Sequence, residues 1–511
     1  MNLSLLILLP ILTSLVILTC RDAKQVRVVA LLGSLLQLAL VGWLTLAYVN
    51  ARNAGADSQF LFEQRAVWFS AFNIQYYVGV DGISVAMIAL TSLVVLAGVL
   101  VSWKVEKMTK EYFFLLMFLA AGAYGFFVSL DLFLMFFFLE VAVIPKFLLI
   151  AIWGSGRKEY SANKLALMLM GGSALVFVGL LAIFFYNGSP SFDLVALSKS
   201  HIPVEVQHKF FPLLFLGFGV FGALFPFHTW VPDGHSSAPT AASMFLAGIS
   251  MKLGGYGCLR VATYLMPEAA HEYQGVIILL ASIAILYGAF ATMMQKDLKY
   301  INAYSSVSHC GFVLLGIGML TKTAIIGAVM QMVSHGLMTA LFFAAIGMLY
   351  ERTHTRMVAQ MGGLLKVTPF IGTVFFIAGL CSLGLPGFSA FPAEMTVFIG
   401  SWQNTDMWYR LATIAACASI VVTAVYILRA IGKVFWGQPL LNPPRGGGLE
   451  QPSDPFSLPL GEGWGGAWNE KLAAIILIAG IVVIGVAPFL LQQLVDGGSQ
   501  QIMEQLSRVG F

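Results

Sequence analysis

Charged side chains are scarce in this chain: 10% of its 511 residues are Asp, Glu, Lys or Arg, whereas 59% are hydrophobic. Soluble proteins devote about a quarter of their residues to these four types, so the composition excludes a soluble globular protein. The formal net charge is only +4, and the basic residues are scattered among short loops. Proteins that bind nucleic acid gather such residues into one patch or stripe, so we expect no nucleic-acid partner.

Cysteine pairs and cofactor motifs are missing as well. The five cysteines stand singly and far apart, at Cys20, Cys258, Cys310, Cys381 and Cys417. This spacing provides neither an iron–sulfur site nor a disulfide framework. No GxGxxG follows a strand and no P-loop is present, so no dinucleotide or NTP site is predicted. We therefore expect no cofactor and no metal ion in this chain.

What the chain has instead is long apolar runs. About 14 of them reach the length of about 20 residues that crosses a bilayer. They fall roughly at 3–20, 26–49, 82–103, 112–129, 131–152, 163–186, 210–235, 240–265, 274–294, 301–320, 323–350, 368–404, 409–436 and 471–492. The first begins at Leu3 without a basic leader or a cleavage site, so we expect a retained helix. The predicted fold is an all-α polytopic membrane protein.

The distribution of Lys and Arg predicts the orientation. With the N-terminus outside, the loops that face inward hold more than twice as many of these residues as the loops that face outward, where Arg260 is counted. Positive loops stay on the cytoplasmic side. We therefore expect a bacterial cytoplasmic (inner) membrane protein with both termini on the periplasmic side.

A proline-broken apolar segment occurs twice, at about 210–235 and about 368–404. Paired broken helices indicate inverted repeats of the kind found in transporters. The sequence thus predicts two inverted five-helix repeats in an antiporter-like fold. The expected units are a three-helix segment (1–110), a first repeat (111–265), a second repeat (266–436), a Gly/Pro-rich loop (437–470) and a C-terminal helix (471–511).

Ionisable residues within the apolar runs are the candidate site, since each is costly in a bilayer and functional by default. Glu140 follows about nine apolar residues, and Lys252 lies mid-run among glycines that let helices pack closely. Lys146 follows Glu140 by six residues, about 240° around a straight helix. After a kink at Pro145 it could pair with Glu140, or it could extend toward the loop at 154–158.

Other polar residues in the runs have two possible roles each. Glu394 opens the second half of a broken helix, where it could cap the helix or carry protons. His309 and His335 suit a proton relay, although either could be a hydrogen-bonded structural residue. His228 and His235 flank the first break and either line a wet cavity or cap it. Charged residues at helix ends are expected to be topology anchors and interhelical ties: Asp81, Asp297, Lys299, Glu351 and Arg352.

Several motifs together point to a known family. They are GVDGIS (79–84), HTWVPDGHSSAPTAASMFLAGISMKLGGYG (228–257), DLKYINAYSSVSHCGF (297–312), QMVSHGL (331–337), LYERTHTR (349–356) and SLGLPGF (382–388). In these segments the chain resembles the antiporter-like M subunits of bacterial NADH:quinone oxidoreductase (respiratory complex I), the counterparts of mitochondrial NADH dehydrogenase subunit 4. By position, the resemblance implies that Glu140, Lys252 and Glu394 belong to the proton channel, with His309 and His335 as its connecting relay.

The resemblance implies a proton-translocating subunit of a membrane enzyme that has no redox site of its own. NADH, FMN, iron–sulfur clusters and quinone would be bound by partner subunits. The partners would be other membrane subunits, including sister antiporter-like subunits, and indirectly the peripheral redox arm. The alternatives are a subunit of a multi-subunit cation/proton antiporter, a subunit of a proton-pumping hydrogenase or formate hydrogenlyase, and a non-conducting structural paralogue.

One position departs from the family pattern. Where the family carries a lysine in the first half of the broken helix, this chain has Phe221. Lys146 could replace that lysine from the helix of Glu140. Alternatively, Glu140 could interact with a neighbouring subunit, or this chain could pump protons poorly.

Overall fold

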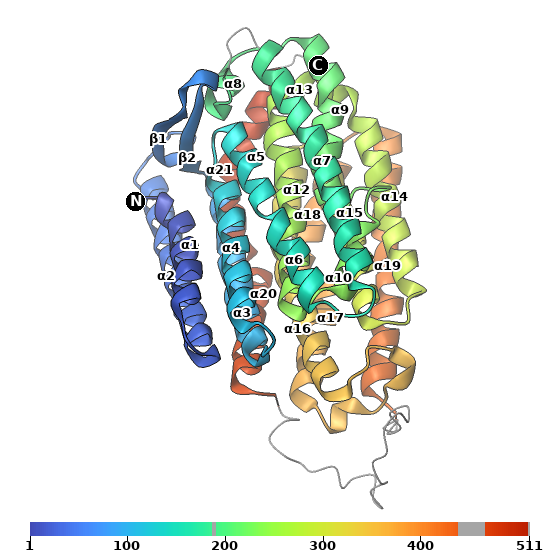
Figure 1. Ribbon diagram of the computed structural model, residues 1–511. Coiled ribbons are helices and arrows are strands. Elements are labelled where there is room, and N and C mark those ends of the chain that lie inside the picture. The colour runs from blue at the N-terminus through green and yellow to red at the C-terminus, as the bar shows by residue number, and fades with distance from the viewer. Residues whose placement is uncertain (187–190, 438–465, 509–511) are drawn as a thin grey trace, which may run out of the picture.

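The computed structural model describes residues 1–186, 191–437 and 466–508, and these form a bundle of α-helices standing side by side (Figure 1). The first crossings are α1 (Ser4–Thr19), α2 (Ala23–Asn53), α3 (Gly82–Val101), α4 (Thr109–Val128), the pair α5 (Leu132–Val141) and α6 (Val143–Trp153), and α7 (Lys158–Tyr186). A second broken pair follows, α9 (Val204–Phe221) and α10 (Trp230–Ser237). One continuous helix completes this half, through α11 (Thr240–Phe245), η3 (Leu246–Ser250), α12 (Met251–Gly257) and η4 (Cys258–Thr263).

The second half has the same plan. Its helices are α14 (Gln274–Met293), α15 (Leu298–Gly318), α16 (Lys322–Thr353), the broken pair α17 (Pro369–Ser382) and α18 (Ala390–Trp402), and α19 (Met407–Phe435). Among the described residues, nine helices are long and apolar enough to cross a membrane, and α1 and α17 are shorter apolar helices. Each predicted crossing coincides with a helix or a broken pair, so the predicted fold class is confirmed.

Both predicted breaks are present, and the backbone explains them. Proline lacks the N–H that an α-helix needs and clashes with the preceding turn. In the second break, Pro386 stands between Gly384 and Gly387, whose φ angles of +64° and +93° are in the left-handed region that favours glycine. In the first, α9 ends at Phe221 and α10 begins only at Trp230. Each break leaves backbone groups free in the middle of a crossing.

A third break separates Glu140 from Lys146. Pro145 cannot donate to the carbonyl of Val141, so α5 ends at Val141 and α6 begins at Val143. The straight-helix angle of about 240° therefore does not apply to the two side chains.

The connection at 50–81, between the predicted crossings at 26–49 and 82–103, contains a β-hairpin that the sequence did not indicate. Strand β1 (Leu61–Phe69) pairs antiparallel with β2 (Ile74–Val80), with Gln64 opposite Val78 and Val67 opposite Gln75. The hairpin lies beside α8 (Leu194–Lys199) at one end of the bundle (Figure 1), and Arg65 forms an ion pair of 2.8 Å with Asp193. Alternation is weak in β1, whose residues are mostly exposed.

The C-terminal region differs from the single helix predicted for 471–511. It forms α20 (Trp468–Val486) and α21 (Pro488–Ser507), because Pro488 cannot continue the hydrogen bonding of α20. Its turn packs tightly against the break between α17 and α18: a Cβ on Gly485 would lie 2.3 Å from the carbonyl oxygen of Gly387. Lys322 Nζ then ties α16 to Asp496 at 2.9 Å.

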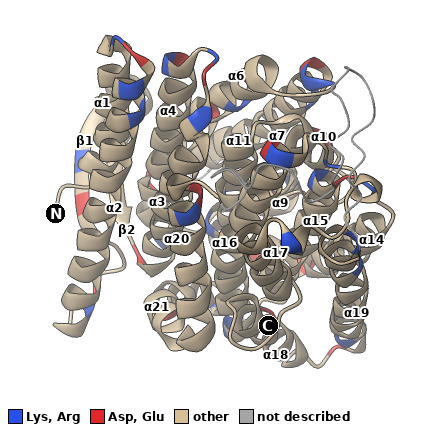
Figure 2. Ribbon diagram, turned by 90° about the horizontal axis from the view of Figure 1, so that it is seen from below, with Lys and Arg blue, Asp and Glu red and all other residues tan. Residues whose placement is uncertain are grey.

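Arg260, counted above in an outer loop, is instead buried within η4 with 1% of its surface exposed. Its guanidinium forms an ion pair with Asp81, which is equally buried and whose other oxygen accepts from the backbone N–H of Ser84 at 2.9 Å. The prediction that Asp81 is an interhelical tie is confirmed. Seen from below, the charged residues are scattered segments on a ribbon that is otherwise mostly uncharged (Figure 2).

We predict that this ion pair holds the hairpin end of α3 against η4. Replacing Arg260 with Gln leaves a buried carboxylate unpaired, a loss of about 3–5 kcal/mol in comparable pairs, so thermal unfolding in detergent should occur at a clearly lower Tm. Asp81→Asn combined with Arg260→Gln removes both charges and should recover part of the loss. A double variant as unstable as the single one would contradict the ion-pair interpretation.

Candidate functional site

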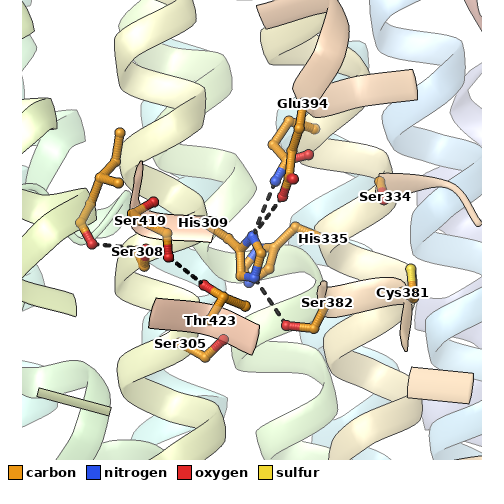
Figure 3. Close-up of polar contacts among 12 residues, drawn as sticks. Ser305, Ser308, His309, Ser334, His335, Cys381, Ser382, Glu394, Ser419 and Thr423 are labelled. Carbon is orange, nitrogen blue, oxygen red and sulfur yellow. Dashed lines mark hydrogen bonds and ion pairs between the residues drawn. The ribbon is translucent and has the colours of Figure 1, made fainter. Parts of the chain in front are cut away.

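Four buried polar side chains form a row that begins at Lys252, in the first half of the bundle, and continues through the second half. Lys252 Nζ lies 2.7 Å from Nδ1 of His335, and the His335 ring stacks on His309 with centroids 5.4 Å apart. Nδ1 of His309 lies 3.3 Å from a carboxylate oxygen of Glu394. Figure 3 shows His309 at the centre, with His335 beside it and Glu394 on one side. None of the four side chains exceeds 5% exposure, and they come from α12, α15, α16 and α18.

Local backbone structure positions Lys252. Two π-helical segments, η3 and η4, flank the short α12 that carries it, and such segments occur frequently at functional sites. Lys252 Nζ also donates to the carbonyl of Ala247 at the start of η3. The ammonium thus has a carbonyl on one side and an imidazole on the other, which a proton can leave or reach.

Glu394 does not act as a helix cap. It lies in the second turn of α18, it is 3% exposed and its carboxylate points to His309 (Figure 3). The break makes room for it: a Cβ on Gly384 would lie 2.6 Å from Oε2 of Glu394. Ser382, at the end of α17, places its hydroxyl 3.2 Å from Nε2 of His309, and the Gln331 amide lies 3.3 Å from Nδ1.

The first half holds a separate pair of charges. Glu140 is half-buried and accepts a hydrogen bond from Ser173 on α7. Lys146 is 1% exposed, so it does not extend toward the loop at 154–158. Its Nζ has no hydrogen-bond partner in the described part of the chain and lies 5.9 Å from the ring centroid of Phe221. Glu140 and Lys146 interact electrostatically across the break without a direct hydrogen bond among the described residues.

A small cavity lies beside Lys252. It encloses about 10 Å³ and is lined by Lys252 and by Gly222, the neighbour of Phe221. Such a volume holds about one water molecule. The cavity therefore places the end of α9 next to Lys252.

Two residues to which the sequence gave other roles are buried as well. Lys299, read as a helix-end anchor, is 6% exposed and its Nζ donates to the carbonyl of Ala238 at 2.6 Å. His235 is fully buried, stacks on Phe343 and interacts electrostatically with both Lys299 and Lys252. The position of His235 beside the first break was the sequence signal for its burial. Lys299 carried no such signal, because it stands next to a loop.

His228 is not part of the row. Its ring packs between Phe225 and Tyr287, with centroids 5.5 and 4.9 Å away. Tyr426, which the sequence did not single out, is buried below His309, and its hydroxyl lies 2.9 Å from Ser305 Oγ. Ser305 and Thr423 cluster on the opposite side of His309 from Glu394 (Figure 3). Among the described residues, no group of three His, Cys, Asp or Glu side chains could hold a metal ion.

The fold and this row define a class: polytopic membrane proteins in which two helical repeats with broken helices enclose a line of buried ionisable groups. Comparisons with known proteins identify the family. Residues 129–421 match the model described as "NADH:quinone oxidoreductase/Mrp antiporter, TM". The chain belongs to this family, as the resemblance predicted.

Two relatives illustrate the match. The chain is 36% identical over 436 residues to NAD(P)H-quinone oxidoreductase chain 4-2 of Synechocystis sp., covering 84% of this chain and 76% of that one. It is 36% identical over 420 residues to NADH-quinone oxidoreductase subunit M of Rickettsia bellii, covering 81% and 83%.

Solved structures show the same fold. A chain of respiratory complex I from Thermus thermophilus superimposes with a TM-score of 0.86 at 25% identity over 100% of both chains. A chain of the Mrp complex from Dietzia sp. superimposes with a TM-score of 0.82 at 19% identity, over 99% of this chain and 98% of that one. The second likeness concerns the fold alone.

We predict that Lys146 lowers the stability of the folded protein. A buried ammonium without a hydrogen-bond partner is unfavourable, so Lys146→Met should leave the Tm in detergent unchanged or raise it, by roughly 1–2 kcal/mol of unfolding free energy. Lys164→Met is the matched control, because Lys164 pairs with Asp233 at 2.7 Å and its loss should lower the Tm. If Lys146→Met is the more destabilising of the two, Lys146 is a structural residue.

Proposed function

We propose that this chain is the proton-translocating, antiporter-like membrane subunit of an NADH:quinone oxidoreductase. The observation that carries the proposal is the buried row Lys252–His335–His309–Glu394, whose neighbouring groups lie within hydrogen-bond or ring-stacking distance. Such a row can pass a proton by successive transfers, with a water molecule as the bridge between the two stacked imidazole rings, which share no hydrogen bond among the described residues. Family membership and the similarity to relatives named as quinone oxidoreductase subunits support it.

Each group has a role in the transfer. Glu394, next to the break in α17–α18, exchanges protons with the half-channel on that side. His309 and His335 accept a proton on one ring nitrogen and release it from the other, which imidazole does without leaving its place. Lys252 holds the proton at the centre of the bundle, where Ala247 and His335 stabilise the ammonium.

The first half supplies a second pair of ionisable groups, Glu140 and Lys146. Lys146 provides a cation beside Phe221, the position where the family resemblance implies a lysine. Glu140, half-buried on α5, either pairs with Lys146 during the cycle or interacts with a neighbouring subunit. When the charge on Lys146 changes, the potential at Lys252 changes too, since both ammonium groups are buried and poorly screened. His228 is at most a peripheral member of this half.

The energy for transport comes from outside the chain. Moving one charge against 100 mV takes about 2.3 kcal/mol, so reduction of quinone in partner subunits is the expected source. NADH, FMN, iron–sulfur clusters and quinone are assigned to those subunits, and the sister antiporter-like subunits are the neighbours in the membrane. This chain is the enzyme's ion-conducting part.

The proposed units are those predicted from the sequence: 1–110, the repeats 111–265 and 266–436, and the C-terminal segment from 471. The segment 437–470 lies mostly outside the described residues. The proposed location is a bacterial cytoplasmic membrane, with the termini on the periplasmic side. The N- and C-termini lie on the half of the bundle that carries the β-hairpin (Figure 1), which agrees with an even number of crossings.

The test is Lys252→Met in the complex purified from its native membrane and reconstituted in vesicles. Flavin and iron–sulfur subunits should co-purify in both forms, while NADH-driven proton uptake falls by roughly tenfold or more in the variant, as when a positioned proton-transfer group is removed. Lys209→Met, an exposed lysine on α9, is the control and should pump normally. Wild-type pumping by Lys252→Met would remove Lys252 from the path. Co-purification of hydrophobic antiporter-type subunits without any redox protein would replace the proposal with the cation/proton antiporter.

The Lys146 assignment is tested by moving the charge. Lys146→Ala should lower NADH-driven proton uptake, and Phe221→Lys added to it should restore a large part, because the new ammonium would enter the region that Lys146 Nζ occupies next to the Phe221 ring. Lys146→Ala with Phe221→Met is the control without the charge and should stay impaired. Normal pumping by Lys146→Ala alone would show that the first half works without this cation.

A further inference from the structure

A cavity lies where α14 ends and α15 begins. Lys252 is not among its lining residues. The cavity encloses about 310 Å³ and is bounded by the end of α14, the first turn of α15, the last part of α19 and the residues at 358–359. The lining residues that matter here are Met293, Lys296, Ile301, Tyr426, Arg429 and Lys433. The loop after α16 belongs to the same face, since Val358 N donates to the carbonyl of Lys296.

The charge of this cavity is of one sign. Lys296, Arg429 and Lys433 line it and are exposed, and no acidic residue is among the described residues of its lining. None of the three has a carboxylate within 4 Å in the part of the chain that the structure describes. The neighbouring Asp297 is engaged elsewhere: it pairs with Arg356 at 3.3 Å and accepts from the backbone N–H of Lys299 at 2.7 Å.

The backbone ends beside the cavity already have partners. Ile301 belongs to the first turn of α15, whose N-terminal end is capped by the Asp297 carboxylate through the backbone N–H of Lys299. At the end of α14, Arg429 donates to the carbonyl of Met293. The positive charge of the cavity therefore comes from its three basic side chains, which make it a preformed anion site.

The protein surface beside the cavity is apolar and can contact lipid acyl chains. Beside the cavity, α14 and α19 expose large apolar side chains: Phe290 (51%), Met294 (75%), Val425 (48%) and Leu428 (51%). These lie within about one helical turn of Met293 or Arg429, which line the cavity itself. A molecule that places an anion among the cations can therefore lay acyl chains along the same two helices. A free anion would gain nothing from this apolar surface.

We propose that this cavity binds the phosphate headgroup of an anionic phospholipid of the surrounding leaflet, with the acyl chains lying along α14 and α19. Basic pockets between transmembrane helices are the usual receptors for such headgroups. The proposal depends on the chain spanning a membrane and is independent of its role in proton transfer.

The experiment uses the full complex in nanodiscs of phosphatidylcholine with or without phosphatidylglycerol, and native mass spectrometry to measure the retained anionic lipid. Substituting Lys296, Arg429 and Lys433 with Gln together should weaken phosphatidylglycerol binding about a hundredfold, since each surface cation contributes about fivefold. Arg21→Gln, Lys24→Gln and Lys107→Gln, which remove the same charge from exposed sites, should retain it. Inorganic phosphate at millimolar concentration should not displace the lipid.

A second variant leaves the charges in place. Ala359, which also lines the cavity and is exposed, can be changed to Trp to fill it, and this should likewise reduce retention of phosphatidylglycerol. Equal retention in the wild type, the triple Gln variant and Ala359→Trp would overturn the proposal. Displacement by inorganic phosphate, or equal retention of phosphatidylcholine and phosphatidylglycerol, would overturn it as well, by showing a free-anion site or an unselective lipid contact.

Discussion

The structure depends on one constraint: a charge or a free backbone group inside a bilayer must find its partners within the protein, because the hydrocarbon offers none. Lys252 meets this constraint with a carbonyl and an imidazole. Arg260 meets it with the carboxylate of Asp81. The breaks in α9–α10 and α17–α18 release backbone groups at the depth where the polar side chains lie. The interior is therefore a connected polar core inside an apolar bundle, and every described ionisable residue of the row touches another.

The two halves meet the constraint differently. In the second half, His309 is held by Glu394, Ser382 and Gln331, and His335 meets His309 by ring stacking. In the first half, Lys146 has no hydrogen-bond partner among the described residues and faces the ring of Phe221. A buried cation without a hydrogen bond is a cost that a purely structural subunit has no reason to keep. This contrast favours a chain that still conducts over one that only holds its neighbours together.

Glycine has a specific part around the second break. At Gly384 a side chain would contact the carboxylate of Glu394, and at Gly485 it would collide with the backbone of Gly387. These close approaches place the C-terminal turn between α20 and α21 against the second break, so the last crossing supports the site without contributing a charge to it. The cavity at the end of α14 is lined by cations instead, and the proposed lipid headgroup would neutralise them.

The sequence by itself determined the class of protein, the crossings and the breaks, because apolar length and proline act locally. It also indicated Glu140, Lys252, Glu394, His309 and His335, since an ionisable residue in an apolar run stands out. It misplaced Arg260, which was counted in an outer loop yet is buried by neighbouring helices. Only the tertiary structure decided which of these groups meet, that Lys146 faces Phe221, and that His228 lies apart. The contacts of the row join residues far apart in the chain, such as Lys252 and His335, which are separated by 83 positions. Helix packing, which no local pattern encodes, sets these contacts.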